Sequence, residues 1–419
     1  MKIKTSINFS NIVLFSIFYL SLIIGFLYNE NLNSGSYGDW IGGNLEPIKS
    51  FSNDFLYTFL NFDDYGHRHS PTYLIFLSLL LKLGVDIDQV RLVHLHLSIL
   101  LFIFFYMCLK LKFENINNNH LILLSLIVFL SPTFRSLAIW PDSRLPGLIF
   151  FVLTIYFFLK FKKTDKFKYT WFTCITLIIS SYISPNFSIF FPYFFFFFIK
   201  KYKLIKLSLL IIFNFLLALP MLYYIFILDV NFLLAGNTPG ALNEHISLSF
   251  NFSDKIMLIS SIIFFHLSPA LIQSNLYKPY LKFLINKSLV LIPLIGCLIY
   301  FFNYQAEYTG GGIFFHLSNT IFNNNYLFFA TSILSIGFVV YIASLNLNNF
   351  ALLFLLIMSN IQNTIYHKYY EPLIIVLYFT LLSHVEAENF LKEKKYIYYL
   401  YLLSFTFIFM RILKNFYSV

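Results

Sequence analysis

Charged side chains are scarce in this sequence. Only 11% of its 419 residues are charged, whereas 58% are hydrophobic and the mean hydropathy is +0.73. A soluble domain carries about a quarter charged residues. The composition therefore excludes a water-soluble globule, a disordered tail and a coiled coil.

Cysteine is also rare. The three cysteines, Cys108, Cys174 and Cys297, lie within or at the edge of apolar runs and share no paired spacing. A disulfide framework or a cysteine zinc site would need such pairs. We expect these thiols to pack as small apolar side chains.

Long apolar runs make up most of the chain. They recur from Asn11 almost to the C-terminus, and each is close to the roughly 20 residues that cross about 30 Å of hydrocarbon. Runs such as Leu121–Leu130 lack the apolar–polar alternation of a membrane β-barrel. We predict one integral membrane domain over residues 1–419, an all-α polytopic helical bundle without a separate soluble domain. The 12–13 expected spans are approximately 11–28, 91–109, 121–138, 146–160, 170–184, 186–199, 205–228, 256–274, 288–303, 323–343, 347–364, 372–385 and 396–412.

The basic residues predict the orientation of these spans. The formal net charge is +10, but Lys and Arg cluster in short loops between apolar runs. The positive-inside rule produces this pattern without a polyanionic partner, so we predict no nucleic-acid binding. Residues 29–70, in contrast, hold six carboxylates against two fixed cations, Lys49 and Arg68, which is typical of an outer loop.

The apolar segment 71–84 determines the topology. Its 14 residues cover about 21 Å as a helix, which is too short for a comfortable span. If the segment crossed the membrane, the Lys-rich segments 160–168 and 200–206 would lie outside. If it lies in the membrane interface, 19 of the 29 Lys and Arg residues fall inside. We therefore predict an interfacial helix within a first outer loop at 29–90, and a cytoplasmic N-terminus in the cell membrane.

Asp39, in Gly38-Asp39-Trp40, is the first candidate for chemistry. It follows the first span by about ten residues, where a carboxylate lies just above the bilayer beside an indole suited to the interface. Such a carboxylate can act as a general base on an acceptor hydroxyl. The alternative is a solvated turn residue in a Gly- and Ser-rich stretch.

The second candidate is the polar cluster at residues 63–71, with the sequence Asp63-Asp64-Tyr65-Gly66-His67-Arg68-His69-Ser70-Pro71. Ser-Pro is a good helix start, and the arginine beside a helix N-terminus favours an anion such as phosphate. The Asp and His residues match no fixed metal-ligand spacing, so we predict no metal ligands here. Anchoring to lipid headgroups is the alternative.

Two further candidates lie at later outer boundaries. Asp142 and Arg144 stand between Pro141 and Pro146, where the aspartate either acts in chemistry or caps the next helix. In the segment 366–372, Lys368 is a candidate phosphate ligand, and Tyr369 beside it belongs either to the site or to an aromatic belt.

These elements resemble the GT-C class of membrane glycosyltransferases, which includes protein O-mannosyltransferases and the aminoarabinose transferase of lipid A. The resemblance rests on an acidic residue after the first span (Asp39), a long outer loop ending in a His/Lys-x-Pro-like start of a short helix, and Arg91 at the next span. The stretch from Ser131-Pro132 to Asp142 is similar to a second outer acidic site of that class. The segment 366–372 is similar to a late aromatic–basic element in some members.

The resemblance implies transfer of a hexosyl or pentosyl unit from a polyprenyl-phosphate-linked donor, with inversion, on the periplasmic or extracellular face. The implied acceptor is a lipid-linked saccharide or another membrane glycolipid of the cell envelope. The base is implied to be Asp39, with Asp63 and Asp64 as alternatives, while Asp142 orients the acceptor. The departing phosphate is implied to meet a basic group from the set His67, Arg68, His69, Arg144 and Lys368, with Tyr369 beside it. A divalent metal is compatible with this chemistry but is not required by the sequence.

Two other functions stay open. An O-antigen-type polysaccharide polymerase usually carries several arginines in its late outer loops. The two late loops expected on the outer face here, 229–255 and 304–322, contain Lys255 as their only Lys or Arg. A lipid-linked saccharide flippase or transporter needs ionisable groups within its spans. His266 and Asn214 are the clearest polar residues there, and a lone histidine on an apolar helix more often bonds a neighbouring helix than a ligand.

Overall fold

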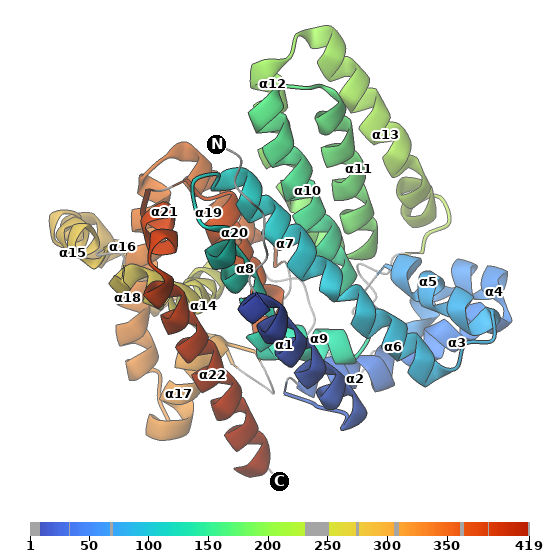
Figure 1. The fold of residues 1–419 in the computed structure, drawn as a ribbon, viewed down its shortest axis with the longest axis horizontal. Coiled ribbons are helices and arrows are strands. Elements are labelled where there is room, and N and C mark those ends of the chain that lie inside the picture. The colour runs from blue at the N-terminus through green and yellow to red at the C-terminus, as the bar shows by residue number, and fades with distance from the viewer. Residues whose placement is uncertain are drawn as a thin grey trace. The chain divides into compact units, whose positions relative to one another are not determined.

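The computed structural model describes residues 9–32, 34–67, 70–230, 251–273, 276–305, 310–360, 364–383 and 385–417. Over these ranges the chain is a succession of helices and contains no strand (Figure 1). The predicted all-α fold is confirmed. In the first half the α-helices are α1 (Phe9–Leu27), α2 (Ser34–Asp39), α3 (Leu45–Asn53), α4 (Phe55–Leu60), α5 (Pro71–Lys82), α6 (Ile87–Leu97), α7 (Ile99–Lys112), α8 (Asn118–Leu126), α9 (Pro132–Ile139), α10 (Arg144–Thr164), α11 (Lys168–Ile183), α12 (Phe191–Lys201) and α13 (Leu204–Phe226). In the second half they are α14 (Phe252–Gln273), α15 (Tyr277–Asn286), α16 (Ser288–Tyr300), α17 (Gly312–Phe322), α18 (Tyr326–Ser344), α19 (Leu347–Met358), α20 (Leu373–Thr380), α21 (Val385–Lys392) and α22 (Lys394–Tyr417).

Seven helical segments of the described chain are long and apolar enough to cross a membrane. They are Phe9–Leu27, Ile87–Lys112, Arg144–Thr164, Leu204–Phe226, Phe252–Ile272, Tyr326–Ser344 and Lys394–Leu413. Two bent helix pairs raise this number to nine if each pair forms one span. The chain is therefore a multi-pass membrane protein.

Several other expected spans are shorter helices. The predicted span 372–385 is the eight-residue helix α20, and 347–364 is the twelve-residue helix α19. Proline explains the division of 186–199, because Pro185 begins the 3-10 turn η4 (Pro185–Phe190) and Pro192 lies in the first turn of α12. The difference from 12–13 spans therefore comes from helix breaks within apolar sequence.

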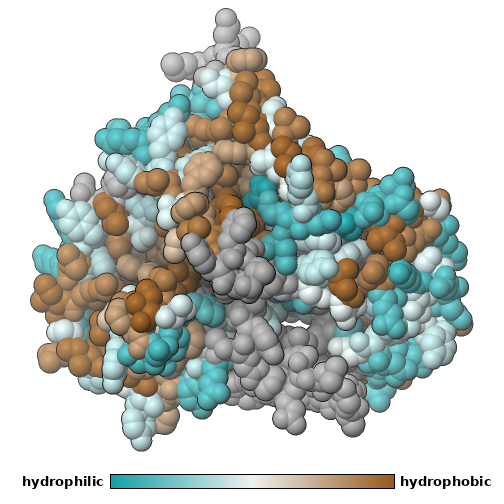
Figure 2. Space-filling model, turned by 90° about the horizontal axis from the view of Figure 1, so that it is seen from below, coloured by the Kyte–Doolittle hydropathy of each residue, from teal (hydrophilic) through white to brown (hydrophobic). Residues whose placement is uncertain are grey.

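The surface carries many apolar side chains (Figure 2). On α13, for example, Ile205 is 78% exposed, Ile212 55% and Phe226 74%. Such a surface requires an apolar surrounding, and lipid supplies it along a helix of this length.

The region that we predicted as the first outer loop, residues 29–90, is helical over much of its length. Residues 34–53 form one continuous helix, in which the π-helical turn η1 (Trp40–Asn44) separates α2 from α3. The predicted helix at 71–84 is present as α5, with Ser70 as its N-cap and Pro71 at its first position.

The chain divides into two compact units, which we call unit 1 and unit 2 and describe separately. Unit 1 comprises Met1–Val13, Phe113–Thr133 and Leu248–Val419, and unit 2 comprises Leu14–Lys112 and Phe134–Ser247.

In unit 2, α10, α11, α12 and α13 lie side by side (Figure 1). Phenylalanine rings fill the space between them: Phe158 of α10 is fully buried and meets the rings of Phe194 and Phe197 at centroid distances of 5.0 and 5.1 Å. Such aromatic pairs contribute about 0.5–1.5 kcal/mol beyond their buried area. The Phe-rich sequence thus has a packing role in this bundle.

In unit 1, α14 is the most buried of the candidate spans, with 72% of its apolar window inside the protein. It packs against α17, α18 and α22. The hydroxyl of Tyr401 on α22 donates to the Leu123 carbonyl of α8 at 2.7 Å, which joins the C-terminal helix to the middle of the chain.

Gly147 allows α10 to approach α11 closely. A Cβ at this position would lie 2.5 Å from the Cβ of Ser184, and the Ser180 hydroxyl donates to the Gly147 carbonyl at 2.7 Å. We expect Gly147→Ala to lower the free energy of unfolding by about 1–3 kcal/mol through overpacking. The measurement is denaturant unfolding in detergent, with Gly296→Ala as the matched control.

Gly296 lies inside α16, and a Cβ there would meet nothing within 4 Å. Alanine should therefore be neutral at this position or stabilise the helix by up to about 1 kcal/mol. Equal effects of the two substitutions would contradict the close packing of Gly147.

Candidate functional site

A guanidinium joins two carboxylates in unit 2. Arg144 Nη1 donates to Asp142 Oδ2 at 2.7 Å and to Asp39 Oδ2 at 3.1 Å. The Asp142 side chain has no exposed surface, whereas that of Asp39 is 36% exposed. Asp142 and Arg144 thus form the buried part of the cluster, and Asp39 is the carboxylate that a substrate can reach.

The π-helical turn η1 places Asp39 at this position. Asp39 is the last residue of α2, and the buried Trp40 begins the turn. At the other end of the turn, Asn44 Nδ2 donates to the Pro141 carbonyl at 2.8 Å. The wider turn thereby fixes both of its ends against the segment that carries Asp142, and such turns are frequent at functional sites.

His67 belongs to the same assembly through Asn44. Its Nε2 lies 2.6 Å from Asn44 Oδ1, and the histidine side chain is buried. Asn44 therefore bridges the predicted polar cluster at residues 63–71 to the turn at Pro141. The sequence analysis did not select Asn44. The feature that could have pointed to it is a polar side chain about one helical turn after Asp39.

The segment before Asp142 is held by an ion pair, a hydrogen bond and a cation–π contact. Arg135 donates to both carboxylate oxygens of Glu30, at 2.7 and 2.5 Å. The indole of Trp140 donates to the Glu30 carbonyl at 2.9 Å, and the Arg91 guanidinium lies 4.1 Å from the indole centroid. These contacts fix the backbone from which Asp142 and Arg144 project.

A buried phenol lies near Asp142. Tyr73 of α5 hydrogen-bonds His94 Nδ1 at 2.5 Å, and His94 Nε2 lies 2.7 Å from the Leu137 carbonyl. Burial, and then the negative charge of Asp142, raise the pKa of Tyr73. Tyr73 therefore stays a neutral hydroxyl and ties α5 to α6 through His94.

The other predicted site residues are placed differently. Asp63 and Asp64 lie in the 3-10 turn η2 (Phe62–Tyr65), where Asp63 is half-buried and Asp64 exposed. Arg68 and His69 lie outside the described residues. Lys368 and Tyr369 belong to unit 1, where the buried Lys368 ammonium lies 5.2 Å from the ring centroid of Tyr366.

An apolar groove opens between α11, α12 and α13 of unit 2. Its volume is about 500 Å³, and Asn214, Ser181, Ser188 and Tyr182 are its few polar lining residues. Asn214, which the sequence marked as a polar residue within a span, bonds the Leu210 carbonyl of its own helix at 2.7 Å. The groove has the size and lining of a site for an apolar chain.

Unit 1 contains a second polar cluster. Its members could be seen singly in the sequence, but their meeting was not predicted. His266 of α14 meets His367, with 2.7 Å between their Nε2 atoms, and Glu371 Oε2 lies 3.8 Å from His367 Nε2. Burial raises the pKa of Glu371 to about 7. Burial, and then His266, Arg411 and His316, lower the pKa of His367 well below its ordinary value.

Comparison of the chain with protein-family models, with curated proteins and with solved structures gives no match.

Proposed function

We propose that this multi-pass membrane protein is a glycosyltransferase that moves a hexosyl or pentosyl unit from a polyprenyl-phosphate-linked donor to a lipid-linked saccharide or another membrane acceptor. In this proposal the reaction takes place on the outer face of the cell membrane. The resemblance of the sequence to the GT-C class supplies the reaction type, and the cluster of Asp39, Asp142 and Arg144 supplies the groups.

The observation that carries the proposal is the sharing of one guanidinium by a buried and an exposed carboxylate. Asp142 holds Arg144 through two bonds, one to Nη1 and one to the backbone N–H at 2.8 Å. Asp39 bonds the same Nη1 more weakly, at 3.1 Å. An acceptor hydroxyl that displaces this bond would meet a carboxylate and a fixed cation at one point.

The proposed step is a single displacement. The acceptor oxygen gives its proton to the Asp39 carboxylate and forms a bond to the anomeric carbon of the sugar. The bond from that carbon to the phosphate oxygen breaks, and its electron pair leaves with polyprenyl phosphate. Arg144 stabilises the negative charge that develops, a role for which a preorganised, partly dry cation is effective. Attack opposite to the leaving group inverts the anomeric configuration.

The apolar groove of unit 2 supports a lipid-linked donor. A polyprenyl chain is entirely apolar, and the groove is lined chiefly by Leu, Ile and Phe side chains from α11, α12 and α13. We assign the carrier chain to this groove and the sugar phosphate to the Arg144 cluster.

Filling the groove should weaken donor binding. Ala218 lines it, and we expect Ala218→Phe to raise the KM for the polyprenyl-linked donor about tenfold or more while kcat changes less. The measurement is the release of polyprenyl phosphate from carrier-labelled donor in proteoliposomes that contain membrane glycolipids as acceptors.

Ala330→Phe is the matched control, because Ala330 is exposed on α18 and does not line the groove. It should leave KM unchanged. An unaltered KM in Ala218→Phe would remove the groove from the donor site.

A further inference from the structure

Three ligand-type atoms converge in the interior of unit 1. His266 comes from α14, whereas His367 and Glu371 lie one helical turn apart just before α20. The nearest nitrogen or oxygen atoms of these side chains all lie within 4.8 Å of one another. All three residues are buried, with exposed fractions of 4–5%.

Two polar atoms of this cluster have no hydrogen-bond partner. They are Nδ1 of His367 and Oε2 of Glu371, both shielded from solvent. A buried polar group without a partner costs about 1–3 kcal/mol. Glu371 Oε2 is the one of these atoms that faces the other members of the cluster, since it lies 3.8 Å from His367 Nε2, whereas His367 Nδ1 is on the far side of its ring. The carboxylate oxygen is therefore open to a bond with a cation placed among the three side chains.

The carboxylate is held in place by hydroxyl groups. Ser131 and Thr133 hydrogen-bond the Glu371 side chain. Outer partners of this kind orient metal-bound carboxylates and raise the affinity of a site.

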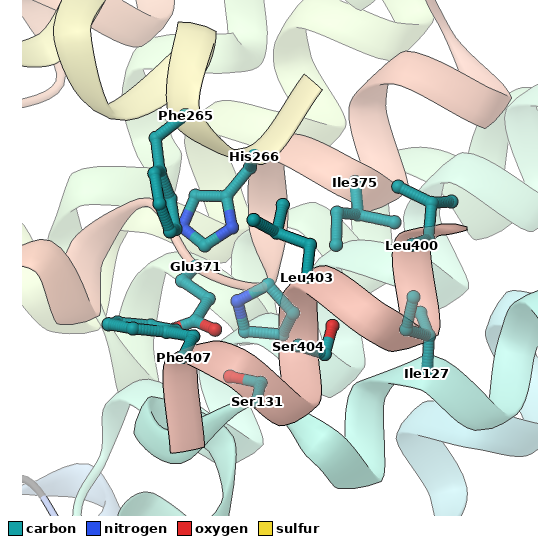
Figure 3. Close-up of a pocket in the computed structure, with 11 residues that line it drawn as sticks. Ile127, Ser131, Phe265, His266, Glu371, Ile375, Leu400, Leu403, Ser404 and Phe407 are labelled. Carbon is teal, nitrogen blue, oxygen red and sulfur yellow. The ribbon is translucent and has the colours of Figure 1, made fainter. Parts of the chain in front are cut away.

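A small cavity adjoins the cluster. Its volume of about 10 Å³ is close to the space for one water molecule. Figure 3 shows the His266 imidazole and the Glu371 carboxylate beside the ring of Phe407, with the hydroxyls of Ser131 and Ser404 nearby. The cavity offers room for a water ligand next to His266 and Glu371.

We propose that His266, His367 and Glu371 bind a divalent transition metal ion, with zinc as the best-matched ion and a water molecule in the adjoining cavity as a fourth ligand. Imidazole and carboxylate together suit zinc, whereas magnesium and calcium select oxygen ligands alone. Ligands at about 2.0–2.1 Å from a tetrahedral ion lie roughly 3.3 Å apart. The 2.7 Å between the two Nε2 atoms therefore needs to widen by about 0.6 Å.

The ion would join α14 to the segment before α20. The hydrogen bond between the two histidines uses the N–H of one Nε2 and the lone pair of the other. A bound ion would instead accept a lone pair from each of the two Nε2 atoms. The site is independent of the proposed sugar transfer, because its residues take no part in the step at Asp39 and Arg144.

Arg411 is the fixed cation whose charge acts on this cluster. Its guanidinium lies 5.3 Å from the ring centroid of Phe407, and its field acts on both His367 and Glu371. A positive charge at this position opposes cation binding. Arg411→Gln should therefore tighten the binding of zinc.

The test uses the purified full chain in detergent, stripped with a chelator and titrated with Co²⁺ and then Zn²⁺. We expect one Co²⁺ per chain with the visible absorption of a four- or five-coordinate site, and its displacement by Zn²⁺. Zinc should also raise the melting temperature of the stripped protein. His266→Gln and Glu371→Gln should abolish the cobalt band and the thermal shift.

Graded variants separate the metal from general packing. Thr133→Val removes a group that orients the Glu371 carboxylate and should weaken Zn²⁺ binding about 10–100-fold. His96 is an exposed histidine of unit 2, and His96→Gln should leave Zn²⁺ binding unchanged. A stripped wild-type chain without a cobalt band overturns the proposal, as does a band that survives in Glu371→Gln. If a variant does not fold, X-ray absorption of the zinc-loaded wild type decides: histidine ligation supports the site, and its absence overturns it.

Discussion

Asp39→Asn is expected to lower sugar transfer by about 10²–10⁴-fold while the protein remains folded and abundant. This range is the usual contribution of a positioned general base. The amide keeps the size of the carboxylate but cannot accept a proton from the acceptor hydroxyl. Because the Asp39 side chain is 36% exposed, its loss of charge should cost little stability. The measurement is the initial rate of polyprenyl phosphate release in proteoliposomes at matched protein content.

Asp165→Asn is the matched control for this substitution. Asp165 forms an exposed ion pair with Lys201 and has a positive φ of 56°, a conformation that asparagine tolerates. Transfer should continue at the wild-type rate in this variant. If Asp39→Asn is also fully active, Asp39 is not the base, and Asp63 and Asp64 become the carboxylates to substitute next.

Arg144→Gln should abolish transfer and also destabilise the fold. The substitution leaves Asp142, whose side chain has no exposed surface, without its cation. Removal of one partner from a buried ion pair costs about 3–5 kcal/mol, because the remaining charge is uncompensated. The measurement is the free energy of unfolding of unit 2, followed by denaturant titration in detergent with a fluorescent probe on α11.

The double variant Asp142→Asn/Arg144→Gln tests the reason for this loss. It removes both charges and should recover most of the stability that Arg144→Gln loses, while transfer stays absent. A double variant no more stable than the single one would show that the cost comes from packing. Transfer by either variant would exclude Arg144 from the proposed step.

The sequence predicted the class of fold but not the division of its helices. Mean hydropathy and run length suffice for an all-α membrane protein, because a span must bury its backbone polar groups in a helix. They do not locate breaks such as that at Pro185 and Pro192, where apolar sequence continues through a change of helix direction. Expected spans such as 372–385 are consequently short helices.

The candidate site could be predicted in part. The motifs at the predicted outer ends of the spans singled out Asp39, Asp142 and Arg144, and the structure joins these residues through one guanidinium. The role of Asn44 could not be predicted, because it depends on a π-helical turn that places Asn44 against Pro141. No propensity rule predicts a single wide turn in this sequence.

The histidine cluster shows a different limit. His367 and Glu371 have a visible spacing of four residues, but His266 lies 101 residues before His367. Only the packing of α14 brings it to them. His266 bonds His367, which lies in the 3-10 turn before α20. This partner, together with Glu371, suggests a metal ligand, the role that the sequence made less expected for a lone histidine.

The most direct measurement of the central proposal asks whether the bond between sugar and carrier is broken. Polyprenyl-phosphate donors labelled in both the sugar and the lipid are placed in proteoliposomes with membrane glycolipid acceptors, and the products are separated. We expect free polyprenyl phosphate and a labelled glycolipid to appear together for at least one hexose or pentose, and to disappear in Asp39→Asn. Movement of intact donor across the bilayer, without release of polyprenyl phosphate, would contradict the transferase and indicate a transporter.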